Sequence, residues 1–218
     1  MRLVASDYPP FEMARPDEGL SGFDYEVVTK SFEITGYRTH IRFMPWNRAI
    51  AEVESGKAAA VLSCAYRAQR QEFALYSDQI SSSTDGVFYR KDHIAPEVTT
   101  ITDLIGRSVA AVQGYATHSR LQDIGANPIG VPDDAAGLKM LEVGRFDYFF
   151  NGRQATDFRI RQLGMSGKFD FSATEDKPLF LCISKAYPEA ERILADFNRG
   201  LSILKADGTY ALIHAKYQ

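Results

Sequence analysis

Short apolar runs alternate with amphipathic segments along most of the chain. A run such as 108–112 is typical of a strand that is covered on both faces. In the amphipathic segments, apolar residues are spaced to fall on one helix face, as at Phe23, Val27 and Phe32, which indicates a half-buried helix. The alternation of the two patterns predicts an α/β protein.

Two stretches, 54–63 and 142–151, repeat the same arrangement. In each, a helical pattern ends at a glycine and a basic residue, and an apolar run follows and ends at a polar side chain, Ser63 or Asn151. Glycine suits the left-handed residue just past a helix. The repeat predicts two similar lobes, and because ligands of open α/β sheets bind at the carboxyl ends of strands, it predicts a ligand cleft between them.

Further strands are predicted at 2–5, 40–43, 83–89, 128–131, 169–171 and 179–183, and further helices around 46–53, 116–121, 133–141, 154–163, 188–204 and 209–217. No flexible linker separates the lobes, so two ordered strands, Gly86–Tyr89 and Leu179–Ile183, are expected to connect them as a hinge. Lobe 1 is predicted to contain residues 1–87 and 184–218, and lobe 2 residues 88–183.

The composition excludes several classes of function. The net charge of −3 and a pI of about 5.8 come with no basic run, which argues against nucleic-acid binding. No apolar segment approaches the roughly 20 residues needed to span a bilayer. The chain opens directly on a strand-like segment without a secretory leader, which leaves open that a leader has been removed.

Catalytic and metal-binding signatures are missing from the sequence. There is no G-x-S-x-G, H-E-x-x-H or P-loop, and no pair of acidic residues stands out from ordinary surface charges. Cys64 and Cys182 belong to no C-x-x-C pair, which makes a zinc site improbable, and buried free thiols are the favoured interpretation. A disulfide between them stays open, because it requires Cα atoms within about 7 Å. We therefore expect no metal, no cofactor and no enzymatic activity.

Two arginines follow the strand that ends at Ser63. Arg67 and Arg70 lie in the segment Tyr66–Arg70, beside the expected cleft. A guanidinium group presents a planar fork of donors that matches a carboxylate, so the pair could bind an acidic ligand. Residue composition alone favours the alternative, a solvated helix face.

Aromatic residues stand at two junctions next to predicted strands. Tyr8 and Trp46 could stack on a ligand at a cleft mouth, or they could pack into the core, and both interpretations stay open. For Phe11, core packing is the better interpretation.

Lobe 2 offers a second group of candidates after its buried strands. A helix opens after 108–112, and the free N–H groups at a helix start attract anions. Asn151 and Arg153 could face the cleft, or they could be a cap and a surface charge. The candidate ligand-binding residues of this lobe are Gly114, Tyr115, Ala116, Thr117, Asn151 and Arg153.

At these residues the chain resembles the bacterial extracellular solute-binding proteins of family 3, the amino-acid-binding component of ABC transporters. The resemblance covers nearly the whole chain, and its strength lies in the ordered recurrence of motifs that are weak singly. It is carried by Asp7–Glu12, Gly22–Glu26, Pro45-Trp46, Gly56-Lys57, Arg70 before Tyr76-Ser77, Asp103–Gly106, Gln113-Gly114, Gly144–Asp147, Ser184-Lys185 and Lys205–Tyr210.

The resemblance implies a two-lobed periplasmic-binding-protein-like fold of type II, with two hinge strands and a ligand cleft between the lobes. It implies that Arg70 binds the ligand carboxylate, that Tyr8 and Trp46 form aromatic walls, and that Gly114–Thr117 is the anion loop of lobe 2.

Three positions depart from the family pattern. Ala65 stands where Thr or Ser is common, and Ala116 lacks a hydroxyl unless Thr117 substitutes for it. The family's amine-binding Asp falls on Gly152, so a ligand ammonium group would lose an interaction of roughly 1.5–3 kcal/mol. Together with Arg67 and Arg153, this departure favours an acidic or amine-free carboxylate as the ligand.

We therefore expect an exported, periplasmic solute-binding protein that delivers a small carboxylate-bearing ligand, an amino acid or a related organic acid, to the membrane subunits of an ABC transporter. A monomer is expected, with no nucleic-acid partner. The first alternative is the ligand-binding sensor domain of a membrane receptor, since the same fold serves there. A cyclic-acid dehydratase on this fold is the second alternative, and the lack of an evident acid–base pair counts against it.

Overall fold

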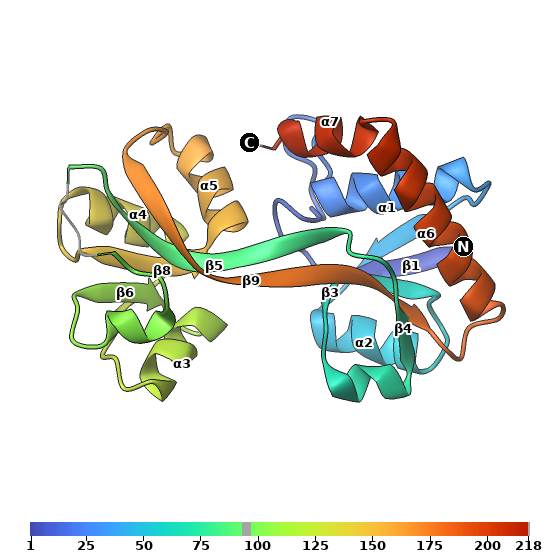
Figure 1. Ribbon diagram of the computed structural model, residues 1–218, viewed down its shortest axis with the longest axis horizontal. Coiled ribbons are helices and arrows are strands. Elements are labelled where there is room, and N and C mark those ends of the chain that lie inside the picture. The colour runs from blue at the N-terminus through green and yellow to red at the C-terminus, as the bar shows by residue number, and fades with distance from the viewer. Residues whose placement is uncertain (93–96, 218) are drawn as a thin grey trace. The chain divides into compact units, whose positions relative to one another are not determined.

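The structure is a computed structural model that describes residues 1–92 and 97–217 (Figure 1). It divides into two compact units. Unit 1 contains Met1–Ser82 and Pro178–Gln218, and unit 2 contains Ser83–Lys177. Both units are α/β, and each is described by itself. None of the described helices is long and apolar enough to cross a membrane.

Unit 1 is built on a mixed sheet of parallel and antiparallel strands. Its strand β1 has only four residues, and the apolar Leu3, Val4 and Ala5 are fully buried. β1 pairs in parallel with β2 on one side and with β3 on the other, and β3 pairs antiparallel with β9. The small strand β4 also pairs antiparallel with β9. The bounds are β1 (Arg2–Ala5), β2 (His40–Phe43), β3 (Ala60–Ala65), β4 (Ala74–Tyr76) and β9 (Phe169–Ser184).

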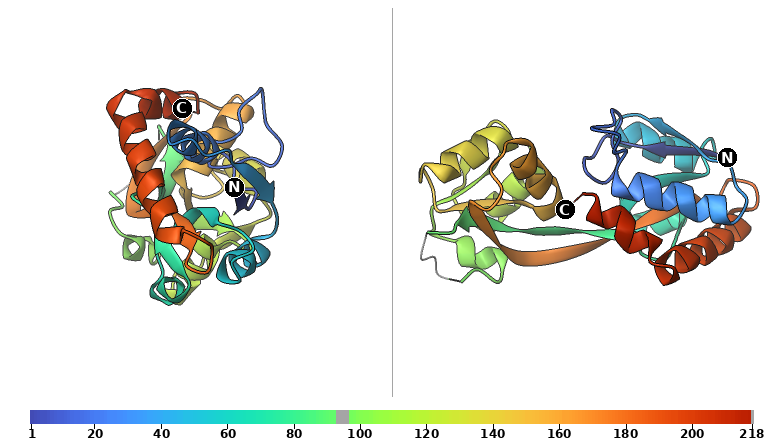
Figure 2. Two further views of the ribbon diagram at one scale, coloured as in Figure 1. Left: turned by 90° about the vertical axis from the view of Figure 1, so that its right-hand side faces the viewer. Right: turned by 90° about the horizontal axis from the view of Figure 1, so that it is seen from above.

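Helices pack on this sheet through the apolar residues along one side of each helix. α1 and α6 pack together along their lengths, and α7 packs against both, as two views of the ribbon show (Figure 2). The small residues Ala49 and Val53 of α2 pack on Val4 and Val61 of the strands. The bounds are α1 (Phe23–Ile34), α2 (Trp46–Glu54), the 3-10 helix η1 (Ala68–Glu72), α6 (Ala190–Ala206) and α7 (Thr209–Ala215).

Unit 2 repeats the sheet-and-helix plan with the strand order β5-β8-β6-β7. β6 is parallel to β7 and β8, whereas β5 is antiparallel to β8. Separate apolar clusters form around Phe149 and Phe150, because successive residues of a strand point to opposite faces of the sheet. The bounds are β5 (Ser81–Arg90), η2 (Ile101–Leu104), β6 (Val109–Val112), α3 (Ala116–Asp123), β7 (Ile129–Val131), α4 (Asp134–Glu142), β8 (Tyr148–Gly152) and α5 (Arg153–Gln162).

The repeated arrangement in the sequence is present in both units. α2 ends at Glu54 and α4 at Glu142, and the glycine two residues later, Gly56 or Gly144, has a φ of 71° in each case. That φ is left-handed, which a residue with a Cβ adopts only with strain. The α/β fold class predicted from the alternating patterns is confirmed.

Two strands run from one unit into the other. The division falls between Ser82 and Ser83 in β5, and between Lys177 and Pro178 in β9. The sequence assigned the connections to the same two strands but to later residues in each. The predicted lobe bounds of 1–87 with 184–218, and 88–183, stay a prediction.

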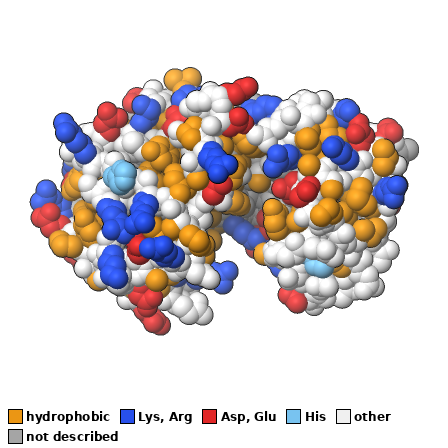
Figure 3. Space-filling view, turned by 180° about the vertical axis from the view of Figure 1, so that it is seen from behind, with side chains coloured by type: hydrophobic (Ala, Val, Ile, Leu, Met, Phe, Trp, Pro, Cys, Tyr) orange, Lys and Arg blue, Asp and Glu red, His pale blue; other side chains and the backbone are white. Residues whose placement is uncertain are grey.

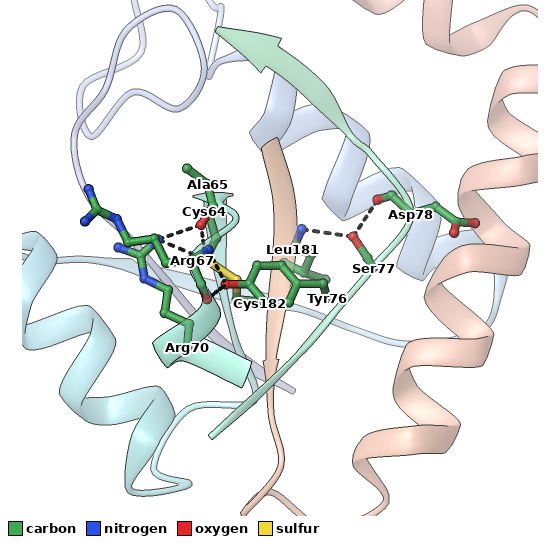
Figure 4. The surroundings of a disulfide bond; sticks show 9 residues. All are labelled: Cys64, Ala65, Arg67, Arg70, Tyr76, Ser77, Asp78, Leu181 and Cys182. Atoms are coloured by element: carbon green, nitrogen blue, oxygen red, sulfur yellow. Dashed lines mark hydrogen bonds between the residues drawn. A yellow bond between two sulfur atoms is a disulfide. The ribbon is translucent and has the colours of Figure 1, made fainter. Parts of the chain in front are cut away.

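The expectation of buried free thiols is wrong. Cys64 in β3 and Cys182 in β9 form a disulfide with a Cα–Cα distance of 5.9 Å (Figure 4). The two strands pair directly, and a register shift between Val61 and Cys64 offsets the cysteines from opposite positions. Adjacent strands bring Cα atoms into the range a disulfide needs, and sequence alone does not show which strands are adjacent.

Candidate functional site

The end of β3 in unit 1 has an irregular backbone. Ser63 has a φ of 50°, and it lies within the register shift between β3 and β9. A non-glycine residue in this conformation is uncommon, and a bulge redirects the side chain of the residue it contains. The Ser63 side chain is directed into the interior of unit 1, where its residue is 8 % exposed.

Ser63 bridges two buried carboxyl groups there. Its Oγ lies at hydrogen-bond distance from Glu12 Oε2, and 2.7 Å from Asp24 Oδ2. Ser81 Oγ lies 2.8 Å from the same Asp24 oxygen. Glu12 is 1 % exposed and Asp24 is fully buried, so these two acids are not ordinary surface charges. We call Glu12, Asp24, Ser63 and Ser81 the buried acid cluster.

The local chain path brings the two acids together. The loop of Glu12 lies across the start of α1, where Phe11 O accepts from Asp24 N at 2.8 Å and Pro10 O accepts from Phe23 N at 3.0 Å. These carbonyl groups satisfy N–H groups that a helix start leaves free, in place of a side-chain cap. Asp24 therefore lies in the first turn of α1, directly beside the loop.

Burial dominates the ionisation of both acids. Desolvation raises the pKa of Glu12 well above its usual value, and the neighbouring Asp24 raises that pKa further. Desolvation raises the pKa of Asp24 to about 7, against the lowering effect of hydrogen bonds from Ser63 and Ser81. The cluster therefore retains protons at pH values where ordinary carboxyl groups have lost them.

The Arg70 side chain is held close to the same strand end. Its Nη1 donates to Ala65 O at 2.7 Å (Figure 4). Its guanidinium carbon lies 5.2 Å from the ring centroid of Trp46. Desolvation lowers the pKa of this half-buried guanidinium, with a further lowering by Arg67. Arg70 therefore lies against Trp46, and its Nη1 is also 3.8 Å from Cys64 Sγ.

Arg67 lies beside Arg70 and is exposed. Its backbone N–H donates to Tyr76 Oη at 3.1 Å, and its carbonyl accepts from the same hydroxyl and from Arg70 N. Tyr76 therefore fixes the backbone of the arginine segment and leaves the Arg67 side chain at the surface.

Tyr8 and Phe11 stack on one another. Their ring centroids are 4.5 Å apart with an interplanar angle of 6°. Phe11 is fully buried, which confirms its assignment to the core, while Tyr8 is 37 % exposed. Tyr8 therefore presents an aromatic face at the surface of the loop that carries Glu12.

In unit 2, the predicted residues gather at the carboxyl ends of the parallel strands β6, β7 and β8. α3, α4 and α5 all begin there. Gly114, Tyr115 and Ala116 are exposed at the start of α3. Thr117 is buried, and its hydroxyl oxygen has no hydrogen-bond partner among the described residues.

Asn151 contacts a carboxylate that was not among the candidate residues, that of Asp134 at the start of α4. Its Nδ2 donates to Asp134 Oδ1 at 2.7 Å, and Asn151 itself is 5 % exposed. The cap of α4 is instead Asp133, which accepts from Ala136 N at 2.8 Å. Desolvation raises the pKa of Asp134, while Asn151 lowers it. A carboxylate therefore stands beside Asn151, although position 152 is glycine.

Arg153 is turned toward its own helix. Its Nε lies 3.3 Å from Asp157 Oδ2, and its guanidinium carbon lies 5.2 Å from the Phe171 ring centroid. Both Arg153 and Asp157 are exposed. The Coulomb energy of such an exposed pair is small, so Arg153 can exchange this partner at low cost.

An acid that is buried in unit 2 pairs with two cations. Asp85, which is 6 % exposed, accepts from both Arg120 and Lys177 at one oxygen. Glu175 also pairs with Arg120, and it lies 3.5 Å from Lys177.

The two signs of charge are mixed on one face of the molecule. On the face in Figure 3, Lys and Arg side chains stand among Asp and Glu. Among the described residues, no group of three or more His, Cys, Asp or Glu side chains could hold a metal ion.

The fold and the grouping of polar side chains at strand ends define a class of protein, the two-lobed α/β binding proteins of type II. The sequence profile of the bacterial extracellular solute-binding proteins, family 3, matches residues 2–218, and the chain belongs to this family.

Similar proteins have names that describe binding. The L-cystine-binding protein TcyA of Bacillus subtilis (strain 168) is 24 % identical over 212 residues, which are 96 % of this chain and 77 % of that protein. The unliganded open L-cystine solute receptor of Neisseria gonorrhoeae has a TM-score of 0.79 at 20 % identity, over 99 % of this chain and 92 % of that chain. A histidine kinase sensor domain similar to periplasmic binding proteins has a TM-score of 0.70 at 23 % identity, over 99 % and 95 %.

Proposed function

We propose that this protein is an extracytoplasmic solute-binding protein that captures a small carboxylate-bearing ligand, an amino acid or related organic acid, and delivers it to an ABC transporter. The observation that carries the proposal is the half-buried Arg70 guanidinium, held between Ala65 O and the Trp46 ring. A fixed, partly desolvated guanidinium binds a carboxylate more strongly than a mobile one, because less conformational entropy is lost.

Each unit supplies part of the ligand contacts in this proposal. In unit 1, Arg70 binds the carboxylate, Trp46 and Tyr8 pack on the ligand body, and Arg67 adds a second cation. Ser63 contributes to this strand end by its backbone, because its hydroxyl is held by Glu12 and Asp24. In unit 2, the start of α3 from Gly114 to Thr117 donates hydrogen bonds. Asn151 and Arg153 provide further polar contacts.

Asp134 changes the expected ligand class. The glycine at position 152 argued for an amine-free ligand, because a ligand ammonium group would find no carboxylate there. Asp134 lies 2.7 Å from Asn151 at the same strand ends, and it can accept an ammonium group in place of that missing residue. We therefore favour an amino acid. The L-cystine-binding names of two similar proteins agree with that class.

The disulfide supports an extracytoplasmic location. Disulfides persist in oxidising compartments such as the bacterial periplasm and are rare in the cytosol. The bond between Cys64 and Cys182 therefore fits a protein that works outside the cytoplasm, as the name of the family also says. The transporter subunits are the proposed partners.

The test is a calorimetric titration with L-cystine, the common L-amino acids and matched amine-free acids. Arg70→Ala should weaken binding of whichever acid binds by about 30-fold or more, since truncating one partner of a buried charge pair costs roughly 2–5 kcal/mol. Arg199→Ala, which changes an exposed arginine on α6, is the control and should bind as the original protein does. Equal binding by Arg70→Ala would remove Arg70 from the site, and no binding of any carboxylate by the original protein would overturn the proposal.

The sensor domain of a membrane receptor is the second candidate function. The observation in its favour is the similarity to a histidine kinase sensor domain over 99 % of this chain. The same titration is expected for both functions, so they are separated by reconstituting the protein with the transporter encoded nearest to its gene. Ligand-stimulated ATP hydrolysis favours the transporter, and its absence with every neighbouring transporter favours the sensor.

A further inference from the structure

The buried acid cluster requires a proton that its serines cannot supply. Its oxygen atoms form a chain of three contacts: Glu12 Oε2 to Ser63 Oγ, Ser63 Oγ to Asp24 Oδ2, and Asp24 Oδ2 to Ser81 Oγ. Each contact between two oxygens needs one hydrogen between them. Ser63 and Ser81 supply one hydrogen each. The third must therefore belong to a carboxyl group.

The surroundings assign this hydrogen to Glu12. Asp24 lies in the first turn of α1, where the helix dipole favours a negative charge, and it can accept from both serines. Glu12 has the contact to Ser63, and it can donate there only as a neutral acid. The groups that raise the pKa of Glu12 through their charge are Asp24 and Asp7, both negative.

Two residues of the chain, Cys64 and Ala65, follow Ser63 of the cluster, and the second of them contacts Arg70. Ser63 keeps its left-handed conformation while its hydroxyl is held between the two acids. Cys64 follows and is fixed to β9 by the disulfide. Ala65 comes next, and its carbonyl oxygen is the acceptor that holds Arg70 Nη1 at 2.7 Å. A change at Ser63 therefore reaches the Arg70 guanidinium through a short, constrained segment.

We propose that Glu12 and Asp24 hold one proton between them and, through Ser63, act as positioning residues for Arg70, so that ligand binding weakens when this proton is lost. Loss of the proton leaves two buried carboxylates facing one serine hydroxyl that can donate to only one of them. Their repulsion is relieved when Ser63 gives up its left-handed backbone conformation and its hydroxyl moves away from the two acids. This change moves Ala65 O away from Arg70. The link to ligand binding rests on the proposed function, while the link to Arg70 does not.

The single tryptophan gives a readout that needs no ligand. Trp46 is the only tryptophan in the chain, and the Arg70 guanidinium lies against its ring. Displacement of Arg70 should change the Trp46 fluorescence, so a titration from pH 5 to pH 9 should show one transition, above the range in which ordinary carboxyl groups titrate. Glu12→Gln places a permanent N–H donor toward Ser63, and its Trp46 fluorescence should be flat across that range. If this variant fails to fold, Asp24→Asn tests the same requirement, because it also removes the second charge.

Control variants separate this transition from other titrations near the cluster. Tyr210 faces Asp24 from α7, and its pKa is raised to about 12, so it stays neutral over this range. His214 lies against Tyr210 with ring centroids 4.4 Å apart, and burial lowers its pKa. His214→Gln and the exposed Glu33→Gln on α1 should both keep the transition. Loss of the transition in His214→Gln, or its persistence in Glu12→Gln, would overturn the proposal.

Two further measurements address the proton and the ligand separately. Infrared spectra at neutral pH should contain the C=O band of a protonated carboxyl group, and this band should vanish in Glu12→Gln. Its absence from the original protein would overturn the shared proton. L-cystine binding, measured by calorimetry, should weaken by up to about tenfold per pH unit above the transition, as linkage to one proton requires. A fluorescence transition without any carboxylate binding would reject the proposed function and leave the positioning of Arg70 intact.

Discussion

Units 1 and 2 each bury carboxyl groups and neutralise them by opposite means. Glu12 and Asp24 in unit 1 are surrounded by serine hydroxyls and by each other. Asp85 in unit 2 is paired with two cations, Arg120 and Lys177. An ion pair keeps the acid charged and leaves its neighbours little affected by pH, whereas an acid pair among hydroxyls keeps a proton. Unit 1 is therefore the unit that should respond to pH near neutrality.

The largest expected effect is the pH dependence of stability in unit 1. The proton that Glu12 and Asp24 hold between them stays bound in the folded protein up to the raised pKa of Asp24, about 7, and the unfolded chain releases it near the ordinary Asp value of 3.8. The folded state therefore binds more protons between these two values, and the free energy of unfolding falls as pH rises through this window. The slope should reach about 1.4 kcal/mol per pH unit for one proton.

Urea unfolding at several pH values between 4 and 8 measures this slope. In the double variant Glu12→Gln with Asp24→Asn, amide and hydroxyl groups satisfy every contact of the cluster without charge, so its curve should be flatter and it should be the more stable protein at pH 8. Asp103 makes the opposite contribution, because N–H donors of Thr99 and Thr100 lower its pKa to about 2. Its stabilising effect is therefore lost only as the pH falls into the acid range. Equal slopes for both proteins would show that unit 1 buries its acids without holding a proton.

In unit 2, the stability that comes from the pairing of Asp85 with Arg120 and Lys177 should depend on the charge of Asp85 and little on pH near neutrality. Asp85→Asn leaves Arg120 and Lys177 without their shared carboxylate and should destabilise the protein by about 2 kcal/mol. The loss stays below that of a fully buried pair, because the Arg120 and Lys177 side chains are 29 % and 35 % exposed.

Urea unfolding at pH 7.5, with and without 0.5 M salt, tests this contrast. The exposed Asp123→Asn on α3 is the matched control and should change stability little. A stability of Asp85→Asn equal to that of the original protein would mean that unit 2, like unit 1, could bury this side chain without ionic partners.

The sequence predicted most elements because their apolar patterns are strong. β1 and β2 begin and end where their alternating patterns do. By contrast, β9 was predicted as two strands, since the middle of its 16 residues is polar and shows no buried face. The short strand β4 was missed for a different reason, because three residues give no measurable period.

The candidate site shows the same limit. Ser63, Arg70 and Trp46 could be named as candidates because strand ends and helix starts can be located along the chain. The pairing of Glu12 with Asp24 was missed, because burial and contact between loop and helix are tertiary features. The disulfide was missed for that reason too, since Cys64 and Cys182 are 118 residues apart and meet only through the pairing of β3 with β9.

Asp134 differs from both the acids of the buried acid cluster and Asp85, because its carboxylate lies beside a neutral amide, that of Asn151. Its hydrogen-bond partner Asn151 carries no charge, and the charge of Arg159 also acts on it, so Asp134 stays an anion that can accept a ligand cation. Asp134→Asn should weaken binding of an amino acid by roughly 10- to 100-fold, from the 1.5–3 kcal/mol typical of a hydrogen bond to a charged group. Binding of the matched amine-free acid should be unchanged or stronger.

Parallel titrations of the original protein, Asp134→Asn and Asp157→Asn measure this selectivity. Asp157 is an acid of α5, whereas Asp134 begins α4, and Asp157 already pairs with Arg153, so its variant should retain the preference for amino acids. Loss of affinity for both ligand types in Asp134→Asn would indicate that Asp134 supports the local fold. Unchanged binding of both would return the ligand to the amine-free class that the glycine at position 152 suggests.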